Sequence, residues 1–340
     1  MSNSLQLTNI GELVTANSAG VERYQNSSLC IEDGKISSIS DRNGDQIIDC
    51  GGKMVTAGFV DSHTHPVFYN KRDEEYRMRL AGATYEEIAE KGGGIISSVE
   101  GVRNASKEAL VEKVMQRMDR FIAGGTTTIE AKSGYGLNTD SELKSLSVID
   151  EVNQNHPIDM VPTFMGAHAF PKEFSNDHDA YIDLICNEMI PAVTDQGVAI
   201  FNDVFCEDKY FTVDQSRRIL EAGREHGLKP RLHADEFVDS GAAVLAGEIN
   251  AFSADHLMAV SEIGIRSIVD NDVVATLLPG TTFFLGKSNY APARKLIDNN
   301  VTVALATDFN PGSSHIQSMP FIMTLACMHM EMTVEEAFQS

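Results

Sequence analysis

The feature that most constrains this 340-residue sequence is an alternation of short apolar runs with longer charged segments, which begins near residue 59. The longer segments, such as SKEALVEKVMQRMDRFIAGG and VDQSRRILEAGREHGL, place apolar residues about every 3.6 positions and reach glycine at their ends, as helices do. The apolar runs have the length of strands, and there are eight: GFVDSHTH, TTTIEAKSGYG, DMVPTFMGAHA, IFNDVFCE, RLHADE, AFSADH, VVATLLPG and TVALATDFNPG. Eight strand–helix units predict an α/β fold, a (β/α)8 barrel of the TIM type, with its active site at the carboxyl ends of the strands.

Residues 5 to 55 differ from the rest of the chain in the pattern of their apolar and turn-forming residues. They read as short strands separated by turn signals, LQLTNI, SSLCIEDGKISSIS and QIIDCGGKMV, and the Asp33-Gly34 pair is typical of a hairpin turn. We therefore predict two domains: residues 1–56 form the N-terminal part of a small, sandwich-like β domain, and residues 57–340 form the barrel.

Charge and composition argue against several classes of partner. The formal net charge is −22 with no basic cluster to offset it, so the chain would repel nucleic acids and anionic membranes. The five cysteines are never spaced as C-x-x-C, which argues against a disulfide framework or a zinc knuckle. No lysine or arginine precedes Arg23 and no long apolar run occurs, so we expect a cytoplasmic protein with neither signal peptide nor membrane span.

Polar side chains gather at one end of the predicted barrel. The residues at or just after the carboxyl ends of the predicted strands are His63, His65, Tyr135, His168, Glu207, His233, Asp235, Glu236, His256 and Asp308. A lone histidine at a strand end is more often a hydrogen-bonded structural group than a metal ligand. Five histidines and an aspartate at corresponding positions favour a binding site, because buried ionisable groups are costly unless they pair or bind something.

Neutral imidazoles with one carboxylate suit Zn²⁺ or Fe²⁺, and such an ion lowers the pKa of a bound water. We predict one divalent metal, held by His63, His65, His233 and Asp308. His256 is either a fifth ligand or a group that stabilises the developing oxyanion. Glu236, three residues after a predicted ligand, is expected to shuttle a proton. The triplet Gly92–Gly94 is either a plain loop or a segment that closes over a ligand.

Several stretches, in order, resemble one enzyme family. HTHPVFYNKRDEEY, EKGGGI, AKSGYGL, GAHA, FCE, HADEF, SADH and ATDFNPGSS are similar to motifs of the imidazolonepropionase family in the amidohydrolase superfamily, and the similarity runs from about residue 5 to the end. The resemblance implies a hydrolase that acts on a C–N bond in a cyclic amide, converting 4-imidazolone-5-propanoate to N-formimidoyl-L-glutamate in histidine degradation. It also implies a homodimer.

The resemblance extends to individual residues. The family's metal ligands fall on the four residues chosen above, and its substrate contacts fall on Arg72, Tyr135, His168, Glu236, Asn310, Gly312 and Ser313. We take Glu236, His256 and Asp308 as the catalytic residues. A strand-four lysine that bridges two metals in some relatives is absent from IFNDVFCE, which implies a mononuclear site.

We expect Arg72 to bind the anionic tail of the substrate. A bidentate contact from this guanidinium would supply the local positive charge that the acidic chain lacks elsewhere. An ordinary surface ion pair is the alternative for the same residue.

Two other functions remain open at this point. A deaminase of a cyclic nucleobase-like heterocycle also pairs a strand-five histidine with a glutamate three residues on, whereas Arg72 and NPGSS favour a substrate with a carboxylate. A metal-free amidohydrolase-like scaffold is the other, although all four predicted ligands are present.

The end of the sequence predicts two further helices. SMPFIMTLACMHM predicts an amphipathic helix that covers the barrel, and TVEEAFQS predicts another with Thr333 as its cap. Members of the resembled family usually continue for several tens of residues and complete the small β domain. We therefore expect a truncated chain whose metal site is intact and whose small domain lacks sheet partners.

Overall fold

The computed structural model describes residues 4–17, 19–40, 44–83 and 93–340, so Gly92 of the glycine triplet lies outside the described residues. The chain forms two compact units, Met1–Gly58 with Thr333–Ser340, and Phe59–Met332. The larger unit begins two residues after the predicted boundary at residue 57. Residues 333–340, which we predicted as part of the barrel, belong to the smaller unit.

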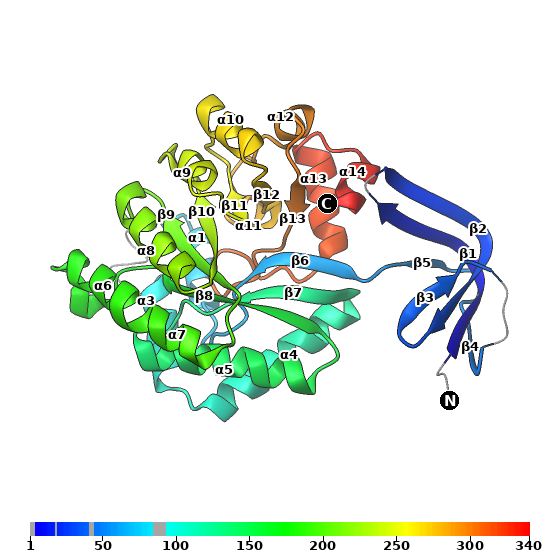
Figure 1. The fold of residues 1–340 in the computed structure, drawn as a ribbon, viewed down its shortest axis with the longest axis horizontal. Helices are drawn as coiled ribbons and strands as arrows, with labels where there is room; N and C mark the ends of the chain where they lie inside the picture. Colours follow the sequence, from blue (N-terminus) through cyan, green and yellow to red (C-terminus); the bar gives the residue numbers. More distant parts are fainter. Residues whose placement is uncertain (1–3, 18, 41–43, 84–92) are drawn as a thin grey trace. The chain divides into compact units, whose positions relative to one another are not determined.

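The larger unit is built on one sheet of eight strands, which follow one another in sequence order. Every neighbouring pair is parallel, and a further parallel bridge joins Thr64 to Phe309, which brings the first and last strands together. The strands are β6 (Phe59–Thr64), β7 (Thr126–Lys132), β8 (Asp159–Ala167), β9 (Phe201–Cys206), β10 (Lys229–Ala234), β11 (Ser253–His256), β12 (Val274–Leu277) and β13 (Val303–Leu305). The predicted (β/α)8 barrel is confirmed (Figure 1).

Helices connect the strands of the larger unit, and Figure 1 shows α4, α5, α8 and α10 outside the sheet. The α-helices are α1 (Asp73–Leu80), α3 (Ile95–Asn104), α4 (Lys107–Ala123), α5 (Thr139–Asn155), α6 (His178–Leu184), α7 (Ile190–Gln196), α8 (Val213–Glu225), α9 (Ala242–Glu248), α10 (Glu262–Asp270), α11 (Pro279–Phe284), α12 (Ala293–Asp298) and α13 (Met319–His329). A 3₁₀ turn (Lys172–Phe174) precedes α6, and a π-helical turn (Ile185–Met189) separates α6 from α7. Within the described part of the chain, no helix combines the length and apolar character needed to cross a membrane.

Burial explains why the strand runs are so apolar. Each residue of β9 is buried, as expected for a parallel strand that packs on both faces. The helices expose one side instead, and α4 buries Leu110, Val114, Met118 and Phe121, which are spaced by three or four residues. The same α4 begins after Ser106, whose hydroxyl accepts a hydrogen bond from the backbone N–H of Ala109.

The smaller unit contains one sheet of five strands around a core of Ile10, Leu13 and Leu29. Its strands are β1 (Ser4–Asn17), β2 (Gly20–Glu32), β3 (Lys35–Ser38), β4 (Gln46–Asp49) and β5 (Met54–Thr56). The predicted hairpin at Asp33-Gly34 is confirmed: both residues have positive φ, 50° and 76°, and Glu32 pairs with Lys35. The predicted cap is also confirmed, because Thr333 forms a capping box at the start of α14 (Val334–Gln339).

The hairpin of β1 and β2 is longer than the sequence predicted. The two strands pair from Ser4 opposite Glu32 to Asn17 opposite Gly20. The added length is polar, and its cross-strand contacts include an ion pair between Glu12 and Arg23. A half-exposed strand of this composition gives a weak apolar alternation, so the sequence pattern missed it.

Candidate active site

His63 and His65 lie at the carboxyl end of β6 and just beyond it, and both are buried. The strand places their side chains on the same side, so that their Nε2 atoms are 3.3 Å apart. The end of the strand is fixed by the closure of the barrel, because the backbone N–H of His65 donates to the carbonyl of Phe309 at 2.8 Å. The closure of the sheet therefore sets the position of the pair.

Two further predicted ligands point at the same space. Nε2 of His233 on β10 lies 3.4 Å from Nε2 of His65. Oδ1 of Asp308, which follows β13, lies 3.5 Å from Nε2 of His63 and 3.6 Å from Nε2 of His65. Ligand atoms around a tetrahedral Zn²⁺ with bonds of about 2.0–2.1 Å lie about 3.3–3.4 Å apart. The spacing of these atoms therefore fits a divalent metal.

Neighbouring carboxylates fix which nitrogen of His63 and of His233 faces this space. Nδ1 of His63 lies 2.7 Å from Oδ2 of Asp255 on β11, and Nδ1 of His233 lies 3.0 Å from Oδ1 of Asp203 on β9. An ionised carboxylate only accepts hydrogen bonds, so each Nδ1 carries the proton and each Nε2 presents a lone pair. Lone pairs that converge at this distance repel one another unless a cation lies between them.

The protonation of the three imidazoles suits a metal as well. Burial lowers the pKa of His63, His65 and His233 well below its usual range, so their imidazoles stay neutral. Burial raises the pKa of Asp308 to about 7, while hydrogen bonds from Thr281 and Asn310 oppose the rise. The hydroxyl of Thr281 on α11 donates to Oδ2 of Asp308, which leaves Oδ1 facing the histidines. The cluster thus indicates a divalent metal site.

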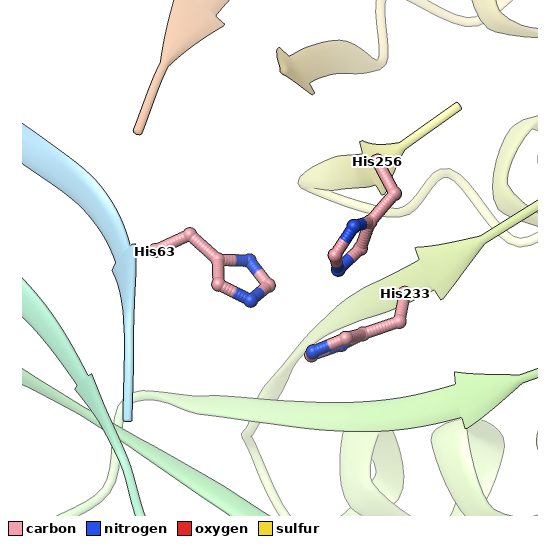
Figure 2. Close-up of side chains that lie close together, drawn as sticks. All are labelled: His63, His233 and His256. Carbon is pink, nitrogen blue, oxygen red and sulfur yellow. The ribbon is translucent and has the colours of Figure 1, made fainter. Parts of the chain in front are cut away.

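His256 lies at the edge of the same cluster. Figure 2 shows its ring beside those of His63 and His233, from which its centroid is 5.4 Å and 5.1 Å away. Among the described residues, neither of its ring nitrogens has a hydrogen-bond partner, and burial lowers its pKa to about 4. Nε2 lies 3.7 Å from Oε2 of Glu236. Both roles considered for His256, ligand and oxyanion stabiliser, are compatible with this position.

The acidic residues after β10 divide into two kinds. Asp235 accepts hydrogen bonds from the backbone N–H groups of Ser240, Ala242 and Ala243, and so holds the start of α9. Glu236 is 8% exposed, and burial together with the nearby Asp308 and Glu207 raises its pKa well above the usual range. Glu236 therefore keeps a proton to higher pH than an ordinary glutamate, whereas Asp235 has a structural task.

Tyr135 and His168 lie beside His65. The ring of His168 stacks on that of His65 with centroids 5.0 Å apart, and Tyr135 lies 5.1 Å from His168. Nδ1 of His168 bonds the carbonyl of Gly134 at 2.9 Å, so its Nε2 is the acceptor. The loop itself is held by the buried carboxylate of Glu142, which accepts from the N–H groups of Gly134, Gly136 and Leu137.

Arg72 and the loop after β13 form the remaining part of the site. The Arg72 guanidinium makes a bidentate ion pair with Glu75, at 2.9 and 2.7 Å, and its side chain is only 9% exposed. A Cβ on Gly312 would lie 2.3 Å from Nη1 of Arg72, so a larger residue there would have to displace the guanidinium. Arg72 also acts electrostatically on Tyr135 and His168. It is thus an ion pair, but a buried one that faces the site.

The side chain of Asn310 organises the same loop. Its Oδ1 accepts from the backbone N–H groups of Gly312 and Ser313, both at 2.7 Å, and its Nδ2 donates to the hydroxyl of Ser313. The predicted contacts Asn310, Gly312 and Ser313 therefore lie together, and Asn310 already bonds the other two.

Sequence reasoning missed Asp203, Asp255, Thr281 and Glu142, which hold the predicted residues in place. The first two had a visible signal. Each is an acid inside an apolar run, IFNDVFCE or AFSADH, where a buried carboxylate is costly without a partner. Thr281 and Glu142 gave no comparable signal, because hydroxyls and acids are common in loops and first turns of helices.

Acid should destabilise the fold partly through His168. Burial lowers its pKa to about 4, whereas an unfolded histidine has a pKa of about 6.5, so between these values only the unfolded chain binds the proton. The free energy of unfolding should therefore fall as the pH decreases from about 6.5 to 4. In metal-free protein, His168→Gln should make this decrease shallower by up to about 1.4 kcal/mol per pH unit. Urea unfolding across this range measures it, and equal slopes for both proteins would contradict it.

The chain has close relatives among known proteins. It is 50% identical over 324 residues to the imidazolonepropionase of Geobacillus thermodenitrificans (strain NG80-2), a match that covers 92% of this chain and 76% of the relative. It is 42% identical to the imidazolonepropionase of Bacillus velezensis (strain DSM 23117 / BGSC 10A6 / LMG 26770 / FZB42), covering 98% of this chain and 83% of the relative. No protein-family model matches the sequence.

Solved structures agree on the fold at low sequence identity. A triazine hydrolase variant superposes with a TM-score of 0.77 at 15% identity, covering 96% of this chain and 76% of that one. Guanine deaminase from C. acetobutylicum superposes with a TM-score of 0.69 at 17% identity, covering 99% and 84%. These likenesses support the barrel architecture, while the sequence relatives identify the family: the chain belongs to the imidazolonepropionases, which are hydrolases.

Proposed function

We propose that this chain hydrolyses the ring C–N bond of 4-imidazolone-5-propanoate and releases N-formimidoyl-L-glutamate, a step of histidine degradation. The main observation behind the proposal is the group of three imidazole Nε2 atoms and one carboxylate oxygen, in which His65 lies 3.3–3.6 Å from each of the other three, in a chain about half identical to imidazolonepropionases. A cyclic amide needs an activated water, a group that stabilises the oxyanion and a proton for the departing nitrogen.

One divalent metal, Zn²⁺ or Fe²⁺, would be held by His63, His65, His233 and Asp308. When bound, such an ion supplies Lewis acidity that lowers the pKa of water and polarises a carbonyl. A mononuclear site is consistent with β9, whose residues Phe201–Cys206 include no lysine.

Glu236 and His256 would carry the proton chemistry. The raised pKa of Glu236 lets its carboxyl group keep a proton to higher pH than an ordinary glutamate and pass it to the departing ring nitrogen. His256 is neutral, and one of its ring nitrogens carries an N–H that can donate to the oxyanion as the carbonyl becomes tetrahedral. Asp308 would act through the metal and by accepting a proton from the attacking water.

The substrate would lie between the Tyr135–His168 pair and the loop after β13. Arg72 brings positive charge to Gly312 in that loop, where the propanoate would bind. A neutral His168 can accept a hydrogen bond from the imidazolone ring through Nε2. The homodimer, the cytoplasmic location and the domain division at residues 56 and 57 stay predictions.

The proposed reaction can be tested directly. Purified protein supplied with 4-imidazolone-5-propanoate should form N-formimidoyl-L-glutamate, and a chelator should abolish turnover until Zn²⁺ or Fe²⁺ is restored. His233→Ala removes one ligand atom and should leave the protein without stoichiometric metal by elemental analysis, whereas the exposed His226→Ala should retain it. Full metal in His233→Ala would refute the ligand assignment. Ammonia release from nucleobase-like heterocycles, without ring opening, would favour the deaminase.

Glu236→Gln tests the proton transfer. The amide has nearly the shape of the carboxyl group but cannot donate and recover a proton in the same way, so kcat should fall by about 10²-fold or more. Metal content should not change, because Glu236 is not one of the proposed ligands. Steady-state kinetics with elemental analysis measures both, and a change confined to KM would remove Glu236 from the chemistry.

Arg72→Ala tests the recognition of the propanoate. KM should rise while kcat changes less, since the contact binds the part of the substrate that does not react. Arg77→Ala is the matched control, because Arg77 lies on α1, which begins directly after Arg72, and pairs with Glu74 three residues earlier, with its side chain 75% exposed. If both variants raised KM equally, a specific role for Arg72 would be excluded.

A further inference from the structure

Lys132, at the end of β7, is a buried cation that the chemistry above does not use. Its side chain is 0% exposed, and its ammonium lies 2.9 Å from Oε1 of Glu130 and 2.6 Å from Oδ2 of Asp203. It also lies 3.9 Å from Oδ2 of Asp255. Burial of an ammonium is costly, so a lysine persists here only where several carboxylates compensate it.

The carboxylates around Lys132 lead to the proposed metal ligands. Asp203 bonds Nδ1 of His233, and Asp255 bonds Nδ1 of His63. Glu130 accepts the backbone N–H of Thr64, and its carbonyl accepts the Thr64 hydroxyl at 2.6 Å. Thr64 lies between His63 and His65. The Lys132 ammonium thus contacts the groups that orient three of the four proposed ligands.

Asp255 and Asp203 depend on Lys132 to different extents. Asp255 also pairs with Arg231, whose Nη2 lies 3.0 Å from Oδ2. Burial opposes ionisation of Asp255, but Arg231 and Lys132 outweigh it and hold the pKa of that carboxyl below its usual range. Among the described residues, Lys132 is the only lysine or arginine within ion-pair distance of Asp203. The contribution of Lys132 should therefore be greatest at His233.

We propose that Lys132 is a positioning residue that, through Asp203 and Glu130, aligns His233 and the His63–His65 strand end and thereby sets the geometry and affinity of the divalent metal site. The inference rests on the metal site of the proposed function. Its role is distinct from that of a simple charge, because a nearby ammonium by itself repels a metal cation. Loss of the charge alone would therefore strengthen metal binding, whereas loss of alignment weakens it.

Lys132→Met separates these two effects. We expect Zn²⁺ affinity, measured by competition with a chelator, to fall about tenfold, as for other residues that orient metal ligands. The d–d absorption bands of the Co²⁺-loaded protein should shift or change intensity, since these report ligand geometry. Lys229→Met is the matched control: the same substitution in β10, the strand of His233, but at its first residue, where the ammonium lies over the rings of Phe201 and Phe252. Its affinity and spectrum should match the wild type.

The outcomes distinguish this inference from the proposed function. Unchanged or higher Zn²⁺ affinity in Lys132→Met, with the wild-type Co²⁺ spectrum, overturns the positioning role and leaves the metal site standing. A wild-type protein that binds no divalent metal overturns the metal site and this inference together. If Lys132→Met does not fold, Asp203→Asn serves instead: it removes the ion pair while keeping an oxygen for Nδ1 of His233. The same loss of affinity and altered spectrum are expected, and their absence overturns the proposal.

Discussion

The burial of ionisable side chains inside the barrel is the constraint on which the rest of the site depends. His63, Asp203 and Asp255 are 0% exposed, in surroundings where charge is costly. They are tolerated because other strands supply partners: β9, which pairs with β10, does so for His233, and β11, which does not neighbour β6 in the sheet, does so for His63. These bonds also decide which nitrogen faces the centre. The hydrogen bonds that compensate the buried groups therefore also orient the proposed metal ligands.

The sequence predicts the strands and the converging side chains, because apolar runs mark strands and the carboxyl ends of parallel strands meet in a barrel. It does not predict which acid meets which histidine. His233 lies opposite Phe205 on β9, and Asp203, two residues earlier, shares the face of that phenylalanine. This pairing depends on the register between β9 and β10. Periodicity within one strand carries no information about register between strands, so the role of Asp203 needed the structure.

The loop after β13 was predicted from resemblance alone, and its internal bonding could not be. Arg79 donates to the carbonyl of Gly312 at 2.7 Å, a contact between residues 233 positions apart in the sequence. Asn310 bonds the N–H groups that a bound carboxylate would otherwise meet. The motif ATDFNPGSS therefore specifies a shaped loop first, and any contact with a substrate depends on that shape.

Four cations near the site form two separate groups. Lys132 and Arg231 contact carboxylates behind the histidines, whereas Arg72 and Arg79 lie at Gly312. Surface charges interact over only about 8 Å at physiological salt, so a formal charge of −22 does not forbid an anionic substrate inside the barrel. Arg72 already shares its charge with Glu75, however. Under the proposed function, selectivity for a carboxylate would then come from the fit of the loop around Arg72 more than from unbalanced positive charge.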